Sequence, residues 1–432
     1  MSPAMTSSNP PPRTIPSGGD NLRRIHRLDA IKALVNTTVN IHPRNVILPR
    51  PIDSLRRGEW VKLICGASFE DAADIRNLSL VYTLAGVDCI DCAADESVVN
   101  AVNDGINAAM NIGSIERPWV MISVNDDKED LHFRKAEFDP ENCPLDCSRP
   151  CEKVCPANAI LLKKSSTGQH SLGSSDASDR LQGGVVTERC YGCGRCFPVC
   201  PFDKIRAKTY IRETAATSEL LKRNDVDAIE IHTTGRHIHL FNELWDTLGT
   251  SIKHVKLVAV SMPDIGNSTF STMQDMHTIM ESRLLGYNLW QLDGRPMSGD
   301  IGRGATREAI NFAMRLAAIP DKPHGFYQLA GGTNLHTIDC LKKVGLFKAI
   351  KFSGTGGIAD SAQALIGGIA YGGYARKIVA RVLHKLPTQP GCMLIEDYPE
   401  YLMEALREAL TLVGPVKSYN MPLSCPQCAQ VH

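Results

Sequence analysis

Short apolar runs rich in β-branched residues alternate with longer helical patterns along most of the chain. From Trp60 onward each run has the length of a buried strand, and the stretch after it carries apolar residues at helical spacing. This alternation is typical of parallel strands joined by helical crossovers. The sequence predicts eight strands, at residues 61–68, 87–93, 119–125, 228–234, 255–262, 288–294, 325–332 and 349–357.

The strand–helix repeats predict an α/β fold, a (β/α)8 barrel of the TIM type. Two separate doubly wound halves are the alternative architecture. The pattern is interrupted between the third and fourth strands, and removal of roughly 75 residues there leaves a length suited to one barrel. Because the insert follows a strand, we expect it on a βα loop at the carboxyl face, where barrels carry their sites.

Composition and periodicity divide the chain into five predicted parts. Residues 1–19 are rich in Pro, Ser, Thr and Gly, and we expect a disordered tail there. Apolar residues at helical spacing from Leu22 to Val35 predict an amphipathic helix. The parts are the tail at 1–19, the helix with strands one to three at 20–138, the insert at 139–211, strands four to eight at 212–390, and a further helix with a Cys425-Pro-Gln-Cys428 tail at 391–432.

Eight cysteines between residues 143 and 200 carry the clearest chemistry of the chain. Their second half, from Cys190 to Pro201, is the full bacterial-ferredoxin run C-x2-C-x2-C-x3-C-P, in which three thiolates bind one cluster and the fourth binds another. A zinc ribbon or a disulfide framework is the alternative, but zinc sites separate two ligand pairs by a long spacer. We therefore predict a ferredoxin-like insert with two [4Fe-4S] clusters, one bound by Cys155, Cys190, Cys193 and Cys196 and the other by Cys143, Cys147, Cys151 and Cys200.

The first cysteine run, from Cys143 to Cys155, has the looser spacing C-x3-C-x3-C-x3-C. A labile or three-iron cluster is therefore an alternative there. The cysteines outside both runs show no comparable spacing. We expect Cys65 and Cys89 to face helices, and Cys340 and Cys392 to lie in or beside helical segments, while Cys425 and Cys428 suit either a thiol–disulfide switch or half of a metal site.

Alternation along the strands predicts a charged barrel interior. In a run such as Val61-Lys62-Leu63 the apolar residues face the helices, which turns the middle residue inward. We expect Lys62 to pair with Asp88 and Glu230 with Lys256, because pairing keeps buried charges at the least cost. This layer is either structural or substrate-facing. The inward residues expected are Lys62, Asp88, Glu230, Lys256 and Lys351, with Cys92, His232, Asp293 and Ser353 nearer the strand ends.

Glycine-rich turns follow the seventh and eighth predicted strands. Barrels that hold phosphate groups use the backbone amides of these two loops, although glycines there also serve tight turns alone. A phosphate-bearing ligand is therefore a candidate, with flavin mononucleotide (FMN) the natural redox cofactor. The binding residues expected are Gly331, Gly332, Gly356 and Gly357, and Arg295 or Arg303 is expected either to pair with an anion or to be solvated.

Composition excludes some classes of function. The 47 Lys and Arg residues are matched by 47 Asp and Glu residues, whereas a nucleic-acid surface needs a clustered basic excess. No apolar run reaches the roughly 18 residues of a membrane span, and no signal core is present. Peripheral association with a membrane stays open. We expect a cytoplasmic protein whose cysteines serve metal or redox chemistry, because the cytosol keeps thiols reduced.

The cysteine runs, with barrel-like sequence on both sides, resemble the cyanobacterial light-dependent period protein family (LdpA). The likeness rests on Cys-Pro-Leu-Asp-Cys-Ser-Arg-Pro-Cys at 143–151 and on the run from Cys190 to Pro201. The resemblance implies an iron–sulfur protein that relays the redox state of photosynthetic electron transport to the circadian clock and modulates its period. It also implies that the eight cysteines bind clusters, and that the partners are a redox donor or acceptor and clock-associated proteins.

Two functions of different class follow. In the first, the clusters sense redox state, and a change in their charge or integrity alters the binding of partners. In the second, the barrel is a flavin-dependent oxidoreductase that the two clusters supply with electrons. The sensor is favoured because no strand-end position offers a convincing acid–base pair. Whether the barrel catalyses a reaction stays open.

Overall fold

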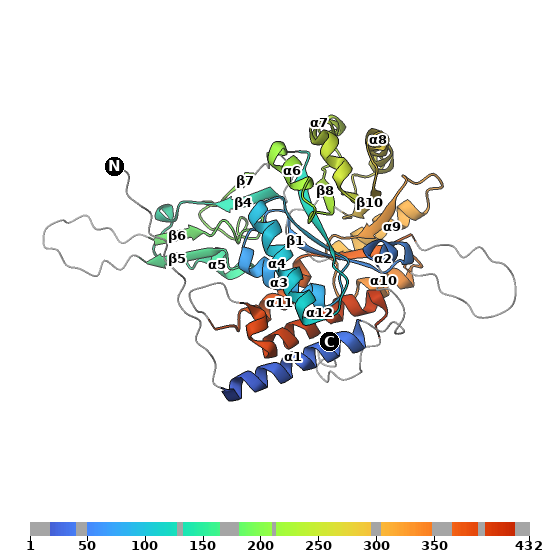
Figure 1. Cartoon of the computed structure of the whole chain (residues 1–432). Helices are drawn as coiled ribbons and strands as arrows, with labels where there is room; N and C mark the ends of the chain where they lie inside the picture. Colours follow the sequence, from blue (N-terminus) through green and yellow to red (C-terminus); the bar gives the residue numbers. More distant parts are fainter. Residues whose placement is uncertain are drawn as a thin grey trace, which may run out of the picture.

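Eight parallel strands close into a barrel at the centre of the molecule (Figure 1). The computed structural model describes residues 18–39, 50–127, 133–164, 181–209, 213–294, 304–347, 365–387 and 394–419. The barrel strands are β1 (Trp60–Gly66), β2 (Cys89–Ala93), β3 (Trp119–Asn125), β8 (Ala228–His232), β9 (Leu257–Met262), β10 (Tyr287–Leu292), β11 (Phe326–Leu329) and β12 (Gly368–Tyr371). They follow the order β1-β12-β11-β10-β9-β8-β3-β2, and each neighbouring pair is parallel.

The predicted α/β barrel is confirmed, and the alternative of two doubly wound halves is wrong. The first seven strands overlap the predicted runs. The predicted position of the eighth strand is wrong, because β12 closes the barrel between β11 and β1, and residues 349–357 lie outside the described ranges. β12 has only four residues and begins with glycine, a poor strand former, so its pattern is weak.

Helices cover the outside of the barrel. They are α3 (Ala72–Leu84), α4 (Glu96–Ile112), α6 (Thr214–Leu221), α7 (Ile238–Leu248), α8 (Thr269–Glu281), α9 (Ala305–Ala317), α10 (Thr337–Lys343) and α11 (Gly373–Leu383). Local capping explains where two of them begin, because Asp71 and Asp95 accept backbone N–H groups of the first turns of α3 and α4. α1 (Gly18–Thr38) and α12 (Pro399–Lys417) pack together outside this layer (Figure 1). None of the helices in the described ranges has the length and apolar character needed to cross a lipid bilayer.

A separate cysteine segment, residues 133–164 and 181–209, projects from the barrel between β3 and β8. β4 (Arg134–Glu137) and β7 (Arg206–Thr209) form one antiparallel pair, and β5 (Ile160–Lys164) and β6 (Leu181–Val185) form another. The short helix α5 (Pro150–Val154) and a 3-10 turn (Pro140–Asn142) lie between them along the chain. This segment lies to one side of the barrel, at the left of Figure 1.

The barrel interior is apolar at the amino-terminal ends of the strands and polar at the carboxyl ends. The helix α2 (Pro51–Arg57) closes the apolar end with Ile52 and Leu55, which pack with Trp60 and Trp119. The two indole rings meet edge to face, with centroids 5.8 Å apart. The buried polar side chains above them are Lys62, Asp91, Ser123, Glu230, His232, Ser261, Gln291, Asp293 and Gln328.

A charged interior is thus present, but the predicted partner of Lys62 is wrong. Lys62 pairs with Glu230, and both side chains are fully buried. Asp88 lies below the barrel, where its carboxylate accepts the N–H of Val61 at 2.8 Å and the Nζ of Lys417 at 2.6 Å. The error arises because β2 begins one residue after Asp88.

The predicted pair of Glu230 with Lys256 is also wrong. Lys256 precedes β9, is 57% exposed, and places its Nζ 2.6 Å from Asp227. Since β9 begins at Leu257, the side chain of Lys256 never enters the barrel. Lys351 and Ser353, also predicted to point inward, lie outside the described residues.

Side chains of β2 face opposite to the prediction. Cys89 lies in the interior with Trp60 and Trp119, whereas Cys92 belongs to the outer core between the strands and the helices. A shift of one residue exchanges the two faces of a strand, and this shift also brings Asp91 inward. Cys65 faces the helices, as predicted.

Candidate functional site

The structure brings together four cysteines from both runs in what we call group I: Cys155, Cys190, Cys193 and Cys196. Burial, followed by the neighbouring thiols of the other three, raises the pKa of Cys196 to about 12. Cys155 and Cys190 also contribute to the raised pKa of Cys193, after burial. The last cysteine of the first run therefore lies with the first three of the second.

The other four cysteines, group II, also combine the two runs. They line one small cavity with Phe138, Leu162 and Ile205. Burial raises the pKa of the Cys143 thiol, and the nearby Cys147 and Cys200 raise it further. Group II is Cys143, Cys147, Cys151 and Cys200.

Backbone N–H groups point at sulfur atoms in both groups. Such donors stabilise thiolates and tune the potential of a bound cluster. Left-handed backbone at Arg149, Asn158 and Asp203 occurs in this same segment, where tight turns are needed to aim the amides. The donors are Ala136 to Cys190 (3.3 Å), Ala159 to Cys155 (3.2 Å), Arg149 to Cys147 (3.5 Å) and Lys204 to Cys200 (3.4 Å).

The donor set suits clusters better than single ions. The eight cysteines are free thiols. Within the described ranges, no three Cys, His, Asp or Glu side chains lie close enough to hold one metal ion. Each group supplies four thiols, the number that a cubane with one thiolate for each iron needs. Ligation by these residues stays a prediction.

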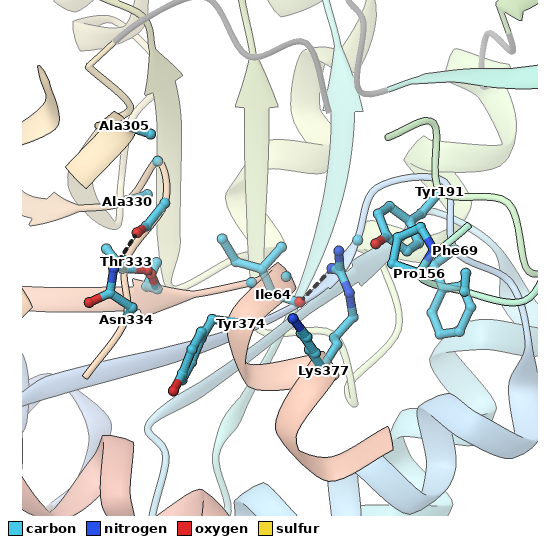
Figure 2. Close-up of a pocket in the computed structure, with 18 of the residues that line it drawn as sticks. Ile64, Phe69, Pro156, Tyr191, Ala305, Ala330, Thr333, Asn334, Tyr374 and Lys377 are labelled. Carbon is cyan, nitrogen blue, oxygen red and sulfur yellow. Dashed lines mark hydrogen bonds between the residues drawn. The ribbon is translucent and has the colours of Figure 1, made fainter. Parts of the chain in front are cut away.

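A cavity of about 450 Å³ opens at the carboxyl ends of the barrel strands (Figure 2). Its floor includes three members of the polar interior, His232, Gln291 and Asp293. The cysteine segment forms another wall through residues next to group I, namely Pro156, Ala157, Tyr191 and Arg195. Figure 2 shows Tyr191, Pro156 and Phe69 on one side and Ala330, Thr333 and Asn334 on the other. The cavity therefore lies between the barrel mouth and the cysteine segment.

Two glycine-rich loops border this cavity. Gly331 and Gly332, predicted as ligand-binding residues, follow β11 and line it. The backbone of Gly331 is left-handed (φ 73°), and an added Cβ would lie 2.3 Å from the carbonyl oxygen of Asp293. The second loop is Gly372 and Gly373, directly after β12. Gly356 and Gly357, which the sequence favoured for this position, lie outside the described residues.

The cavity residues Tyr374, Arg376 and Lys377 of α11 were missed from the sequence. The sequence did contain a signal for them, because Gly372-Gly373 follows a short apolar run, as the loop after a barrel strand does. The longer glycine motif at 353–357 gave a stronger signal for that loop. Arg295, Arg303, Cys392, Cys425 and Cys428 lie outside the described residues, and Cys340 lies in α10.

A hydrogen-bonded chain runs beneath the cavity through the barrel interior. The Nε2 of Gln328 donates to Gln291 Oε1 at 2.8 Å, and the Nε2 of Gln291 donates to Glu230 Oε1 at 2.8 Å. His232 Nε2 lies 3.4 Å from the same carboxylate oxygen, and Lys62 binds the other. This network places the buried Glu230 beside His232, and of the two only His232 lines the cavity.

The pKa values of Asp91 and Lys62 are both raised in the barrel interior. Burial, then repulsion from the Glu230 carboxylate, raises the pKa of Asp91 to about 7. For Lys62, burial lowers the pKa, but Glu230 and Asp91 together outweigh burial and leave the pKa raised. The interior therefore combines a charged lysine with a carboxyl group that titrates close to pH 7.

Several contacts join the cysteine segment to the barrel. The buried Lys135 donates to Glu70 Oε2 and to the carbonyl oxygen of Thr187, both at 2.9 Å. The Arg376 guanidinium lies 4.4 Å from the ring centroid of Tyr191, and its Nη1 donates to the carbonyl oxygen of Cys65 at 2.7 Å. Tyr191, the neighbour of Cys190, therefore contacts Arg376 of α11, which in turn binds the backbone of β1.

Two family models match different parts of the chain. A family model for the LdpA Fe-S cluster-binding domain matches residues 143–211, which include both cysteine groups. A model for the light dependent period A C-terminal domain matches residues 220–415, which include β8 to β12. Among curated proteins, "Light dependent period A" of Synechococcus elongatus is 40% identical over 367 residues, which cover 85% of this chain and 94% of that protein.

Proposed function

Because the chain belongs to the light dependent period A family, we propose that it is an iron–sulfur redox sensor that relays light-dependent redox state to the circadian clock and modulates its period. The observation that carries the proposal is that eight cysteines come together beside the barrel as group I and group II. The iron–sulfur domain match and the name of the relative support the same context. Its partners are then clock-associated proteins and a redox donor or acceptor.

Two [4Fe-4S] clusters are the cofactors we propose, cluster I on group I and cluster II on group II. The segment 139–211 is then a ferredoxin-like insert between the barrel parts 20–138 and 212–390. When bound, such clusters store and relay single electrons. The chain itself supplies the thiolates, the N–H donors to sulfur and a partly apolar surrounding, which together set the potentials.

The barrel contacts of the segment supply a means of signalling. Oxidation or loss of cluster I changes the charge next to Tyr191, over which Arg376 lies. The same change reaches Lys135 through Ala136, whose N–H donates to Cys190. A sensor needs an element that a local charge change biases between two arrangements, and these contacts between segment and barrel are the element we propose.

Substitution of one ligand tests the cluster assignment. Cys193→Ala removes cluster I and leaves the electron paramagnetic resonance signal of cluster II in anaerobically prepared protein. Iron and acid-labile sulfide fall from about eight of each per chain to about four. Cys340→Ala, a cysteine of α10 outside both groups, is the matched control and keeps both signals. Two intact signals in Cys193→Ala would defeat the assignment.

A flavin-dependent oxidoreductase is the second candidate. The cavity between the barrel mouth and cluster I favours it, because a redox cofactor there has the cluster on one side and the pair of Glu230 and His232 below. Stoichiometric flavin in the anaerobic protein, with turnover of a reducible substrate, supports the enzyme. A brown protein that neither contains nor binds flavin supports the sensor.

A further inference from the structure

The cavity at the barrel mouth has the size and position of a cofactor site. Its volume of about 450 Å³ falls within the roughly 300–1,000 Å³ of small-molecule pockets. It lies at the carboxyl ends of the strands, where barrels bind their ligands. What it binds follows from the chemistry of its walls.

One end of the cavity is cationic. Lys377 is exposed, lines the cavity and makes no ion pair or hydrogen bond with another described residue. Figure 2 shows Lys377 beside Tyr374, at the start of α11. α11 begins after Gly372 with no side chain capping its first N–H groups, so these amides remain available to an anion. A negatively charged group fits here.

The packing of the described residues does not explain the glycine at position 373. Its φ is not left-handed, and an added Cβ would meet only a guanidinium nitrogen of Arg376, at 3.9 Å. Alanine is moreover the better residue within a helix. A residue without a side chain is needed where a ligand approaches the backbone closely. Gly373 therefore marks the point of approach, next to Lys377.

The wall formed by the cysteine segment includes the charged Arg195, but its surface around Tyr191 is apolar and partly aromatic. Phe69 and Tyr191 meet edge to face there, with ring centroids 6.3 Å apart, and Pro156 and Ala157 continue the surface. Flat rings bind well against such walls. Pro156 and Tyr191 directly follow Cys155 and Cys190 of group I.

We propose that this cavity binds a phosphate monoester that carries a flat aromatic ring system, with the phosphate at Gly373 and Lys377 and the rings toward Tyr191. FMN has this chemistry. The site deepens the second candidate function and rests on it, and it does not depend on whether the protein acts on the clock.

A ligand in this site contacts both the barrel and the cysteine segment. A ligand that contacts both parts stabilises the contact between the cysteine segment and the barrel by mass action, and the coupling is reciprocal. Ligand binding therefore slows loss of cluster I. This second part of the inference rests on the proposed cluster.

The test uses the full chain with its clusters, prepared without oxygen and dialysed free of flavin. Calorimetry measures the binding of FMN and of riboflavin, which has the same rings without the phosphate. We expect one FMN per chain and riboflavin binding at least about tenfold weaker, because charge-assisted hydrogen bonds to the phosphate are lost. Chelator-induced loss of iron slows by up to about 100-fold when free FMN is 100 times its Kd.

Variants locate the site. Lys377→Ala and Gly373→Ala each weaken FMN by about tenfold, leave riboflavin unchanged and do not lower the melting temperature. Lys342→Ala, an exposed lysine of α10 away from the cavity, is the matched control and changes neither affinity.

Absence of saturable FMN binding, equal binding of FMN and riboflavin, or insensitivity to both variants would overturn the proposed site. An unchanged rate of iron loss would overturn only the coupling. Iron and sulfide are counted on the same sample. A sample with full iron and sulfide that does not bind FMN contradicts the ligand site alone. A sample that binds FMN but lacks the expected iron and sulfide contradicts the cluster assignment alone.

Discussion

Removal of the buried charge of Lys62 is the most direct test of the barrel interior. Lys62 and Glu230 are both fully buried and paired, and Asp91 lies close enough to raise the pKa of Lys62. Lys62→Met keeps the length of the side chain but removes the ammonium group that pairs with Glu230 and lowers the pKa of Asp91. Glu230 then keeps its hydrogen bond from Gln291, and His232 Nε2 still lies 3.4 Å from the same carboxylate oxygen.

The expected cost is about 3–5 kcal/mol of unfolding free energy, because a buried charge that loses its partner stays desolvated. Lys62→Met with Glu230→Gln removes both charges, so the double variant is less destabilised than the sum of the single variants. The single variant also depends on pH. An unpaired Glu230 has a raised pKa in the folded state, so its penalty is small at pH 5 and grows as the pH rises toward 8.

Urea unfolding followed by tryptophan fluorescence measures this cost. The chain has 4 tryptophans, and all of them are buried in barrel strands or in α7: Trp60, Trp119, Trp245 and Trp290. Lys256→Met is the control, since Lys256 is exposed and its partner Asp227 also binds Arg117, so we expect a loss of at most about 1 kcal/mol. A loss equally small for Lys62→Met, or strict additivity in the double variant, would refute the buried-pair reasoning.

Other expectations address the cavity, the interior and the clusters. Asp91 has a folded pKa of about 7, raised from 3.8, so wild-type stability falls as the pH rises from 4 to 7, and Asp91→Asn flattens this profile in melts across that range. Gly331 and Gly345 both have left-handed backbone, but only at Gly331 would a new Cβ lie 2.3 Å from a backbone atom, the carbonyl oxygen of Asp293. We therefore expect Gly331→Ala to lower the unfolding free energy by more than Gly345→Ala, whose expected cost is roughly 1 kcal/mol. Iron removal by a chelator leaves barrel unfolding unchanged in tryptophan fluorescence but makes 139–211 sensitive to protease; equal protection with and without iron contradicts the proposed clusters.

Periodicity predicted the barrel well because its strands are buried on both faces and read as continuous apolar runs. That same continuity hides which residue starts a strand, and so the inward side of β2 was exchanged at Cys89 and Cys92. β12 escaped notice because four residues that begin with glycine carry too little signal. Such errors are local, whereas the barrel as a whole rests on many repeats.

The sequence predicted the candidate site only in part, because some of its contacts join segments that are far apart in the chain. Cysteine spacing depends on short-range geometry, so the sequence predicted which cysteines would gather from the two runs. The cavity depends on segments far apart in the chain, such as Ile64, Tyr191 and Arg376, and no pattern links them. The contact of Lys135 with Glu70 is equally non-local. Pairing of this kind follows only once the fold is known.

The antiparallel pair of β4 and β7 determines how the segment between these strands could be inserted into the barrel or removed from it. Arg134 lies opposite Thr209, so the chain enters and leaves the intervening module at neighbouring points, about 5 Å apart. The barrel strands β3 and β8 pair as they would across an ordinary short connection. We expect the module to be exchangeable. A short linker in its place yields a barrel that lacks both cysteine groups but keeps its own cysteines, and the excised module can be grafted onto another scaffold through the same two-stranded stem.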